Sequence, residues 1–503
     1  MHWHLISITV SMSILSATWF DEIPRIIRQP DGEILECFIS GDQYSRRLYD
    51  INNFTIVHHK EDGFFYYAQK DSYGSLMPST IIAGRGNPRS IGLEPGYSIS
   101  NEDYNRKKQF YHQEELVRDN RDAPNTGEIN QINVFIRFAD DPEFPNDRST
   151  YGEIFETEYD EPSLKHYFSE ISHDRLTINT LHFPGSLDGS NASYVDSYER
   201  SYYQPYSAAN SNGYQSQSDR FLREHSLVAN ALNSISQSVP SSVDLDLDDN
   251  GFVDAVSIVV YGTQGAWADL LWPHRTALFN EEVYINGAQV YDYLFMLSES
   301  WYYNVGVLCH EFGHVLGAPD YYHYSAGSGP TPVGYWDVMG SVRNPPQYPS
   351  AFTKWKYFNW IEPVEITSSG TYSLMPLQEE ENSSFFVSSP FSEEEYFIFE
   401  YRNQEGLYDS NAPGTRSGLV AYRINEGAGN GNASGPPDEL YVYRPQGDIN
   451  STGNLNNAPY SLTYGHDQLN DYSDPSCFLY NGGEGGIGGL QLFDVTEPTD
   501  SIS

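Results

Sequence analysis

The stretch WYYNVGVLCHEFGHVLGAPD, residues 301–320, determines how the rest of this sequence is interpreted. Apolar residues surround its centre, which predicts a buried helix with a few polar positions on one edge. At 3.6 residues per turn, His310 and His314 lie one turn apart on the same face, so both imidazoles can reach a single ion. The spacing therefore predicts a metal site of the kind that zinc occupies.

The residues around the two histidines extend this interpretation. Glu311 lies beside them and is placed to act as a general base toward water activated by the metal. Gly317 stands where helices commonly end in a left-handed conformation, and Pro319 prevents the helix from resuming. A turn there would bring the carboxylate of Asp320 back to the ion as a third protein ligand, and His323 is the alternative.

The string HEFGHVLGAPDYY, followed by GYWDVMGS at 334–341, resembles the M6 (immune inhibitor A-like) family of secreted metalloproteases, which are relatives of the metzincins. Other segments similar to that family are QPDG at 29–32, GDQY at 41–44, DGFFYYA at 62–68, INVFIRFADDPEF at 132–144, SLKHYFSEISHDRLTI at 163–178 and WPHR at 272–275. The resemblance implies a metzincin-like α/β (α+β) catalytic domain, a zinc cofactor, and protein or peptide substrates.

The same resemblance assigns a role to Met339, which matches the methionine that forms a hydrophobic floor beneath the metal in metzincin-like enzymes. Without that context the residue would be ordinary core filler. Several metzincins place a tyrosine two residues later to stabilise the oxyanion, whereas this chain has Ser341. Tyr335 and His274 are the remaining candidates for the oxyanion partner, and a packed aromatic and a loop histidine are the alternatives.

Length, charge and cysteine content indicate an acidic, exported protein of several domains. The 503 residues are enough for about three domains, and a net charge of −41 argues against nucleic acid or an anionic membrane as a partner. A short apolar segment at 5–15 predicts a signal peptide over residues 1–17 and hence secretion. It is too short to span a bilayer, so stable membrane insertion is not expected. Three cysteines cannot form a disulfide framework.

Residues 18–126 are predicted to form a prosegment and linker. Short alternating β runs are followed by a polar stretch at 101–126, whose basic residues offer sites to an activating protease. A protease of this kind stays inactive while a side chain fills the open position of its metal. Asp42 is the preferred candidate for that latency contact, Cys37 is the alternative, and a plain Gly-Asp turn is equally compatible with the sequence.

The remaining chain divides at about residue 360. Residues 127–360 alternate predicted strands and helices, which predicts an α/β catalytic core. Residues 361–503 consist of short aromatic and β-branched runs separated by Gly, Asn and Pro, which predicts a C-terminal, all-β, sandwich-like domain. Glu400 and Arg402 within it are expected to form a surface or interface ion pair.

The segment DLDLDDNGFVD, residues 244–254, predicts a second metal site, which calcium would suit. Its pattern resembles the first nine positions of a calcium loop, D-x-D-x-N-G-x-x-D, with Gly251 allowing the sharp bend. Ser257 stands where an EF-hand has Glu, so a shorter loop leading into a strand is predicted, and an empty acidic turn is the alternative. The candidate ligands are Asp246, Asp248, Asn250 and Asp254.

Together these features predict a secreted, zinc-dependent endopeptidase made as a zymogen. His310, His314 and Asp320 would hold the ion with a fourth position open. Glu311 would take a proton from water and return it to the leaving amine. The alternatives are an aminopeptidase with the same chemistry, and an adhesion or carbohydrate-binding protein that uses the domain as a scaffold. The intact set of ligands and base argues against a scaffold.

Overall fold

A computed structural model describes residues 20–41, 46–59, 61–71, 74–100, 103, 122–157, 161–185, 192–263, 273–299, 303–324, 329–379, 383–483 and 486–503. The predicted signal peptide, Asp42, Trp272 and the basic part of the predicted linker lie outside these residues. Among the helices of the described part, none combines the length and the apolar character that crossing a bilayer requires.

The first of three large sheets is antiparallel, and each of its strands pairs with the next one along the chain. Aspartates fix its turns: Asp50, Asp62 and Asp71 each accept a hydrogen bond of 2.9 Å from a backbone amide two or four residues later. The strands are β1 (Phe20–Arg28), β2 (Ile34–Gly41), β3 (Arg46–Tyr49), β4 (Thr55–His58), β5 (Phe65–Lys70) and β6 (Leu76–Ile82).

The second sheet forms the centre of the catalytic region. Its order is β11-β14-β10-β7-β8, with β9 also paired to β7; all pairs are parallel except β11 with β14 at the edge. Parallel strands are buried on both faces, which explains the continuous apolar run of β10. The strands are β7 (Gly127–Arg137), β8 (Leu176–Phe183), β9 (Tyr194–Val195), β10 (Val256–Val260), β11 (His274–Ala277) and β14 (Asp292–Leu297).

Helices cover both faces of this sheet. Alternate residues of β10 point to opposite sides: Val259 belongs to the core that contains α3 (Leu164–Ile171) and α5 (Val305–Val315). Ile258 belongs to the core under α4 (Gln217–Ile235). The three-layer arrangement confirms the mixed α and β class of the catalytic region. Also present are α2 (Arg148–Gly152), α6 (Ala351–Lys356) and the hairpin of β12 (Val283–Ile285) and β13 (Ala288–Val290).

The third sheet lies in the C-terminal region and has the order β15-β16-β17-β18-β19. One of its faces shares a core with α5 and α6 of the catalytic region, through Ile398, Val420 and Tyr422. The other face packs on the last part of the chain, including the pair β20 (Leu469–Asn470) and β21 (Gln491–Leu492). The strands are β15 (Val364–Glu365), β16 (Ser384–Ser388), β17 (Glu395–Arg402), β18 (Gly418–Asn425) and β19 (Leu440–Val442).

This packing leaves the predicted sandwich unconfirmed, because one face of the sheet packs on catalytic helices and the other on a segment that includes the short pair β20 and β21. Glu400 and Arg402 are fully buried at that junction, where the Arg402 guanidinium lies 3.1 Å from the Glu400 carboxylate. The Glu400 carboxylate also accepts a 2.6 Å hydrogen bond from the backbone of Ala351, at the start of α6. The expected ion pair therefore belongs to the interface between the regions.

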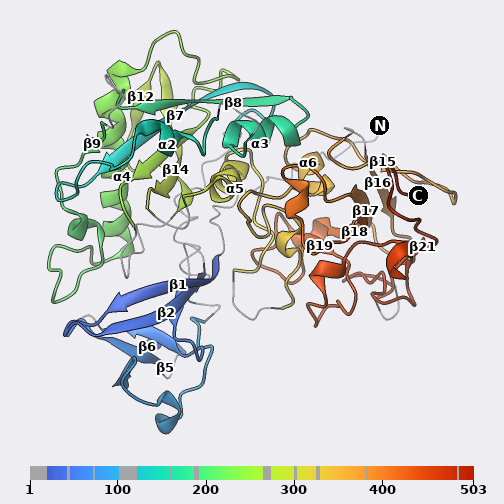
Figure 1. Cartoon of the computed structure of the whole chain (residues 1–503), viewed down its shortest axis with the longest axis horizontal. Coiled ribbons are helices and arrows are strands. Elements are labelled where there is room, and N and C mark those ends of the chain that lie inside the picture. Colours follow the sequence, from blue (N-terminus) through green and yellow to red (C-terminus); the bar gives the residue numbers. More distant parts are fainter. Residues whose placement is uncertain are drawn as a thin grey trace, which may run out of the picture.

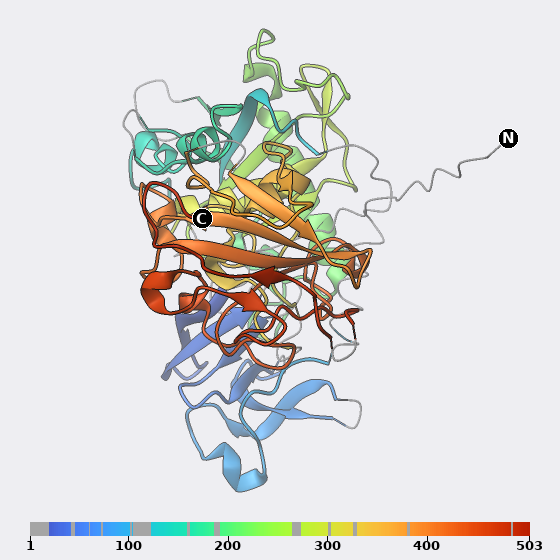
Figure 2. The same ribbon diagram turned by 90° about the vertical axis from the view of Figure 1, so that its right-hand side faces the viewer.

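Figure 1 shows α5 at the centre of the molecule, with the catalytic sheet above and to its left, the C-terminal sheet to its right and the N-terminal sheet below. Figure 2 shows the molecule with the C-terminal sheet in front, again with the N-terminal sheet beneath it.

The short 3-10 helices are η1 (Pro88–Ile91), η2 (Arg200–Tyr203), η3 (Ser236–Ser238), η4 (Gly334–Trp336), η5 (Asp409–Asn411), η6 (Glu426–Ala428), η7 (Leu455–Asn457) and η8 (Leu462–Tyr464).

Candidate metal centre

Helix α5 begins and ends as its sequence requires. The side chain of Asn304 caps its first turn by accepting a 3.0 Å hydrogen bond from the amide of Val307. Gly317 has a φ of 94°, in the left-handed region that glycine adopts without steric cost. The chain reverses there, and Asp320 returns to the face of α5 that carries the two histidines.

Glycine on α5 allows the chain to come unusually close. A Cβ placed on Gly306 would lie 1.9 Å from the carbonyl oxygen of Arg343, and one on Gly313 would lie 2.6 Å from the sulfur of Met339. Between these glycines, the Nδ1 of His310 lies 2.8 Å from the carbonyl oxygen of Val338. One stripe of the helix therefore packs against the 338–343 segment, and the metal-facing histidine is oriented by the same contact.

Three side-chain atoms converge beside α5. The Nε2 atoms of His310 and His314 are 3.1 Å apart, and the Oδ1 atom of Asp320 lies 3.1 Å from the first and 3.5 Å from the second. In a tetrahedral zinc site with bonds of about 2.0–2.1 Å, ligand atoms lie about 3.3 Å from one another. The three donor atoms thus have the mutual separations that a zinc ion imposes.

The protonation of the two rings follows from their other nitrogens. The Nδ1 of His310 faces the carbonyl of Val338, and the Nδ1 of His314 lies 2.6 Å from the carbonyl oxygen of Ala318. A carbonyl only accepts hydrogen bonds, so each neutral ring carries its hydrogen on Nδ1 and presents a lone pair at Nε2. Two lone pairs and a carboxylate oxygen that face one another in a buried site repel unless a cation lies among them, so these residues fit a metal ion.

Charge and burial act in opposite directions on these groups. Burial opposes the charged form of His310, but the hydrogen bond and charge of Asp320 raise its pKa above the usual value. Burial alone would raise the pKa of Asp320, and the neighbouring His314 and His310 lower it well below its usual value. Glu311 is fully buried next to them on α5. The site thus holds a carboxylate in its charged form at neutral pH.

The turn that contains Met339 is fixed by a buried carboxylate. Asp337 accepts hydrogen bonds from the amide of Met339 at 2.8 Å and from the amide of Ser350 at 2.7 Å. The amide of Tyr321, next to Asp320, donates to the carbonyl oxygen of Met339 at 2.9 Å. The sulfur of Met339 therefore lies close to α5 at Gly313, and its role as a floor beneath the metal stays a prediction.

Comparison with known families decides the class of this centre. The model of the immune inhibitor A peptidase M6 catalytic domain matches residues 250–347, which include the whole metal cluster. The chain therefore carries an M6 peptidase catalytic domain at these residues. It is accordingly a metalloprotease, and both the predicted family and the predicted enzyme class are confirmed. Comparison with curated proteins gave no match.

Other candidates for roles in the M6 site lie apart from the three donor atoms. His323, the alternative third ligand, forms a hydrogen-bonded pair with Asp438 of the C-terminal region. The Nε2 of His274 lies 2.8 Å from the buried carboxylate of Glu224, and Tyr335 is 41% exposed with the Arg343 guanidinium over its ring. Within the described part of the chain, no contact assigns an oxyanion partner.

The two latency candidates differ in what can be said of them. Asp42 lies outside the described residues. The thiol of Cys37 is buried, and burial raises its pKa to about 12. Because zinc binds the thiolate, this environment disfavours Cys37 as a ligand.

The predicted calcium loop brings together the carboxylates of Asp246, Asp248 and Asp254, whose oxygens lie within 4.8 Å of one another. Asp254 is only 6% exposed, and its Oδ1 accepts no hydrogen bond from any described residue. Burial and the neighbouring carboxylates raise its pKa to about 7. The side-chain amide of Asn250 donates to Asp248 at 3.0 Å, and its backbone amide donates to Asp246 at 2.8 Å.

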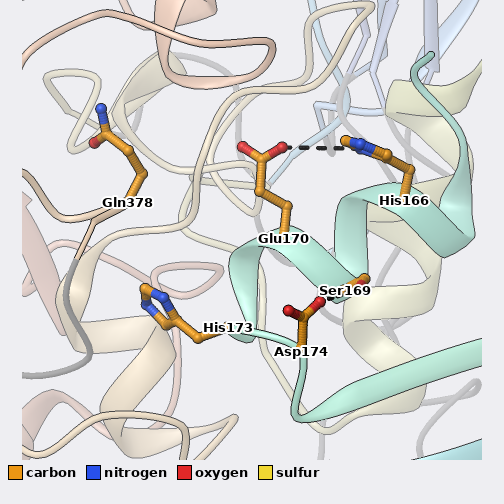
Figure 3. A pocket seen from close by; sticks show the side chains of 6 residues that line it. All are labelled: His166, Ser169, Glu170, His173, Asp174 and Gln378. Carbon is orange, nitrogen blue, oxygen red and sulfur yellow. Dashed lines mark hydrogen bonds and ion pairs between the residues drawn. The ribbon is translucent and has the colours of Figure 1, made fainter. Parts of the chain in front are cut away.

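A polar cavity of about 380 Å³ lies on the side of α3 that faces away from the catalytic core. Figure 3 shows Glu170 directed toward His166 within it, and the Nδ1 of His166 lies 3.8 Å from the Glu170 carboxylate. The cavity shares no residue with the metal cluster. Its lining residues are His166, Ser169, Glu170, His173, Asp174 and Gln378.

Several residues of the centre gave no signal in the sequence. The carbonyl groups of Val338 and Ala318 orient the histidines through backbone atoms, which no side-chain motif records. The hydroxyl of Tyr324 donates to Oδ2 of Asp320. Its position four residues after Asp320 offered only a weak hint, since tyrosine is common throughout this chain.

Proposed function

We propose that this M6 peptidase is a secreted zinc endopeptidase, made as a zymogen, which hydrolyses peptide bonds in proteins with Glu311 as general base. The observation that carries the proposal is the convergence of two imidazole lone pairs and one carboxylate oxygen within 3.5 Å in a buried site. Nitrogen and oxygen donors in a set of three are typical of catalytic zinc, which keeps a position open for water or substrate.

His310, His314 and Asp320 would hold the zinc. When bound, zinc polarises a substrate carbonyl and lowers the pKa of water toward neutrality. Glu311 follows His310 directly on α5, so its carboxylate is carried on the same rigid helix as the ligands. It would take a proton from the attacking water and pass it to the leaving amine. The water oxygen would bond to the carbonyl carbon as the carbon–nitrogen bond breaks, which gives one new carboxyl group and one new amine.

The test of this mechanism is Glu311→Gln. The amide keeps the shape of the side chain but cannot accept the proton, so we expect peptidase activity to fall by about 10²–10⁴-fold. Metal analysis should find the zinc content of the parent, because no ligand has been changed. Glu282→Gln, at an exposed carboxylate of the same region, is the matched control. Full activity of the processed Glu311→Gln protein would refute the role of Glu311.

Latency is proposed from the burial of the centre. His310, Glu311, His314 and Asp320 are all at most 2% exposed, so a peptide can reach them only after part of the chain has moved or been removed. We propose that an activating protease cuts between residues 101 and 126, and that Asp42 holds the chain inactive until then. Asp42→Ala should increase the activity of the uncut chain toward casein; a variant as latent as the parent would remove Asp42 from the proposal.

We also propose that calcium binds Asp246, Asp248 and Asp254, with Asn250 as a further oxygen ligand. The buried Oδ1 of Asp254, without a donor in the described chain, supports a cation at this point. Such an ion would brace the loop that leads into β10. Adding calcium should raise the melting temperature of the parent and leave Asp248→Ala unchanged, and an equal response in the two proteins would contradict the assignment.

A further inference from the structure

The chain segment that carries Asp320 is held from outside the catalytic region. Loop 431–433, between β18 and β19 of the C-terminal sheet, packs directly against it. The amide of Asn432 donates to the carbonyl oxygen of Asp320 at 2.8 Å, and the amide of Tyr324 donates to the carbonyl oxygen of Ala433 at 3.2 Å. Two backbone hydrogen bonds therefore join the metal-binding segment to a loop that follows it by more than a hundred positions in the chain.

The side chain of Asn432 also links the catalytic region to the C-terminal region through hydrogen bonds. Its amide nitrogen donates to the carbonyl oxygen of Tyr321 at 3.2 Å and to that of Leu440 at 2.7 Å. Its amide oxygen accepts from the amide of Leu440 at 3.1 Å. Asn432 is fully buried, so water cannot replace these bonds. One side chain thus ties the residue after Asp320 to the first residue of β19.

The loop leaves no space for adjustment. A Cβ on Gly431 would lie 2.7 Å from the carbonyl oxygen of Asp320 and 2.7 Å from the Cβ of Pro319. The amide of Gly431 donates to the buried carboxylate of Glu439, which also accepts from the hydroxyl of Tyr357 at 2.7 Å. The loop is therefore fixed on both sides, by the C-terminal sheet and by the end of α6.

This contact determines where the third ligand points. Oδ2 of Asp320 accepts a hydrogen bond from the hydroxyl of Tyr324. The backbone of Tyr324 is in turn hydrogen-bonded to Ala433 of loop 431–433. Oδ1 is thereby left directed at His310, 3.1 Å away. Displacing the loop would release both the backbone and the side chain of Asp320.

We propose that Asn432 is a positioning residue of the metal centre, and that the C-terminal region is for this reason a structural part of that centre. The inference rests on the proposed function, because it takes Asp320 as a ligand. Asn432 acts through Asp320 and Tyr321 and touches neither metal nor substrate. Outer partners of this kind are typically worth about 10–100-fold in metal affinity.

The experiment compares Asn432→Ala with the parent, both as full chains, in a zinc competition assay against a chromogenic chelator. We expect Asn432→Ala to bind zinc about 10–100-fold more weakly, and its cobalt-substituted form to show an altered visible spectrum, because the geometry of the ligands has changed. The matched control is Asn425→Ala: Asn425 is buried in the same sheet, and its side-chain amide makes no hydrogen bond to a described residue.

A measurement on the unmodified protein covers the case in which Asn432→Ala fails to fold. Chelating the zinc should speed hydrogen exchange in the peptide that spans residues 429–435, because the Asn432 amide loses a rigid acceptor. Unchanged exchange there, or equal zinc affinity of Asn432→Ala and parent, would overturn the inference and leave the zinc site itself intact. A parent chain without zinc affinity would overturn the proposed function as well.

Discussion

At the scale of single residues, the centre depends on the absence of side chains as much as on their presence. Glycine inside a helix usually costs about 1 kcal/mol relative to alanine. Glycine is needed at Gly306 and Gly313 because the 338–343 segment lies where their Cβ atoms would be. This segment orients His310 and contains Met339. Side chains at Gly306 and Gly313 would push the 338–343 segment away from α5, and His310 would lose the carbonyl that orients it.

Gly306→Ala should therefore reverse the usual effect of alanine in a helix. The added Cβ would meet the Arg343 carbonyl oxygen at 1.9 Å, so the backbone must shift. We expect a loss of about 1–3 kcal/mol in the free energy of unfolding, measured with denaturant. Gly185→Ala is the control, because a Cβ there meets nothing within 4 Å. A stability of Gly306→Ala equal to that of the parent would show that α5 and the segment are not in tight contact.

Sequence reasoning worked best where chemistry and spacing coincide in one short stretch. His310, His314 and Asp320 were selected from local spacing and a glycine turn, and they are the three side chains that converge. Asn432 could not be selected in the same way. Its contribution consists of amide hydrogen bonds to a segment 111 positions away, and only the packing of the C-terminal sheet brings the two together.

At the scale of elements, α6 carries a buried charge at the junction with the C-terminal sheet. Lys354 is fully buried, and its ammonium nitrogen lies 3.0 Å from Nε2 of His173. Burial lowers its pKa to about 7, an effect that the charge of Glu400 partly opposes. In the unfolded chain the pKa is about 10.4. Keeping Lys354 charged in this buried position therefore costs stability, and in the folded protein the group loses its proton at neutral to moderately alkaline pH.

This difference predicts a pH dependence of stability. Between pH 7 and about 10 the unfolded chain binds more protons at Lys354 than the folded chain, so the free energy of unfolding rises with pH, by at most about 1.4 kcal/mol per unit. Lys354→Met should lack this part of the slope between pH 7 and 9 in denaturant titrations. Lys70→Met, at an exposed lysine, should retain it. Identical slopes for Lys354→Met and parent would contradict the assignment.

The elements themselves were predicted unevenly. The catalytic strands and α5 have strong apolar patterns, because a parallel sheet is buried on both faces. The β character of residues 361–503 was also evident, but the predicted sandwich is not confirmed. Pattern reveals that a strand has two buried faces, and it does not reveal whether a sheet or a helix covers them.

At the scale of the whole molecule, the net charge of −41 acts on every element at once. Like charges at this density repel, and dissolved salt screens them over distances of about 10 Å at 0.1 M. We expect the melting temperature to rise between 10 mM and 0.5 M sodium chloride. Lithium chloride at the same ionic strength should act alike, as screening requires. A melting temperature that is insensitive to ionic strength would show that the acidic groups are already neutralised by pairing or bound cations.

The contact of Asn432 with the Asp320 segment also sets an order of events during synthesis. A ribosome releases the two histidines and Asp320 well before it makes β18 and β19, and domains generally fold in that N-terminal-first direction. The nascent chain therefore contains every ligand but lacks the piece that aligns the third one. The metal centre would therefore be completed only after β18 and β19 have been made, well after its three ligands.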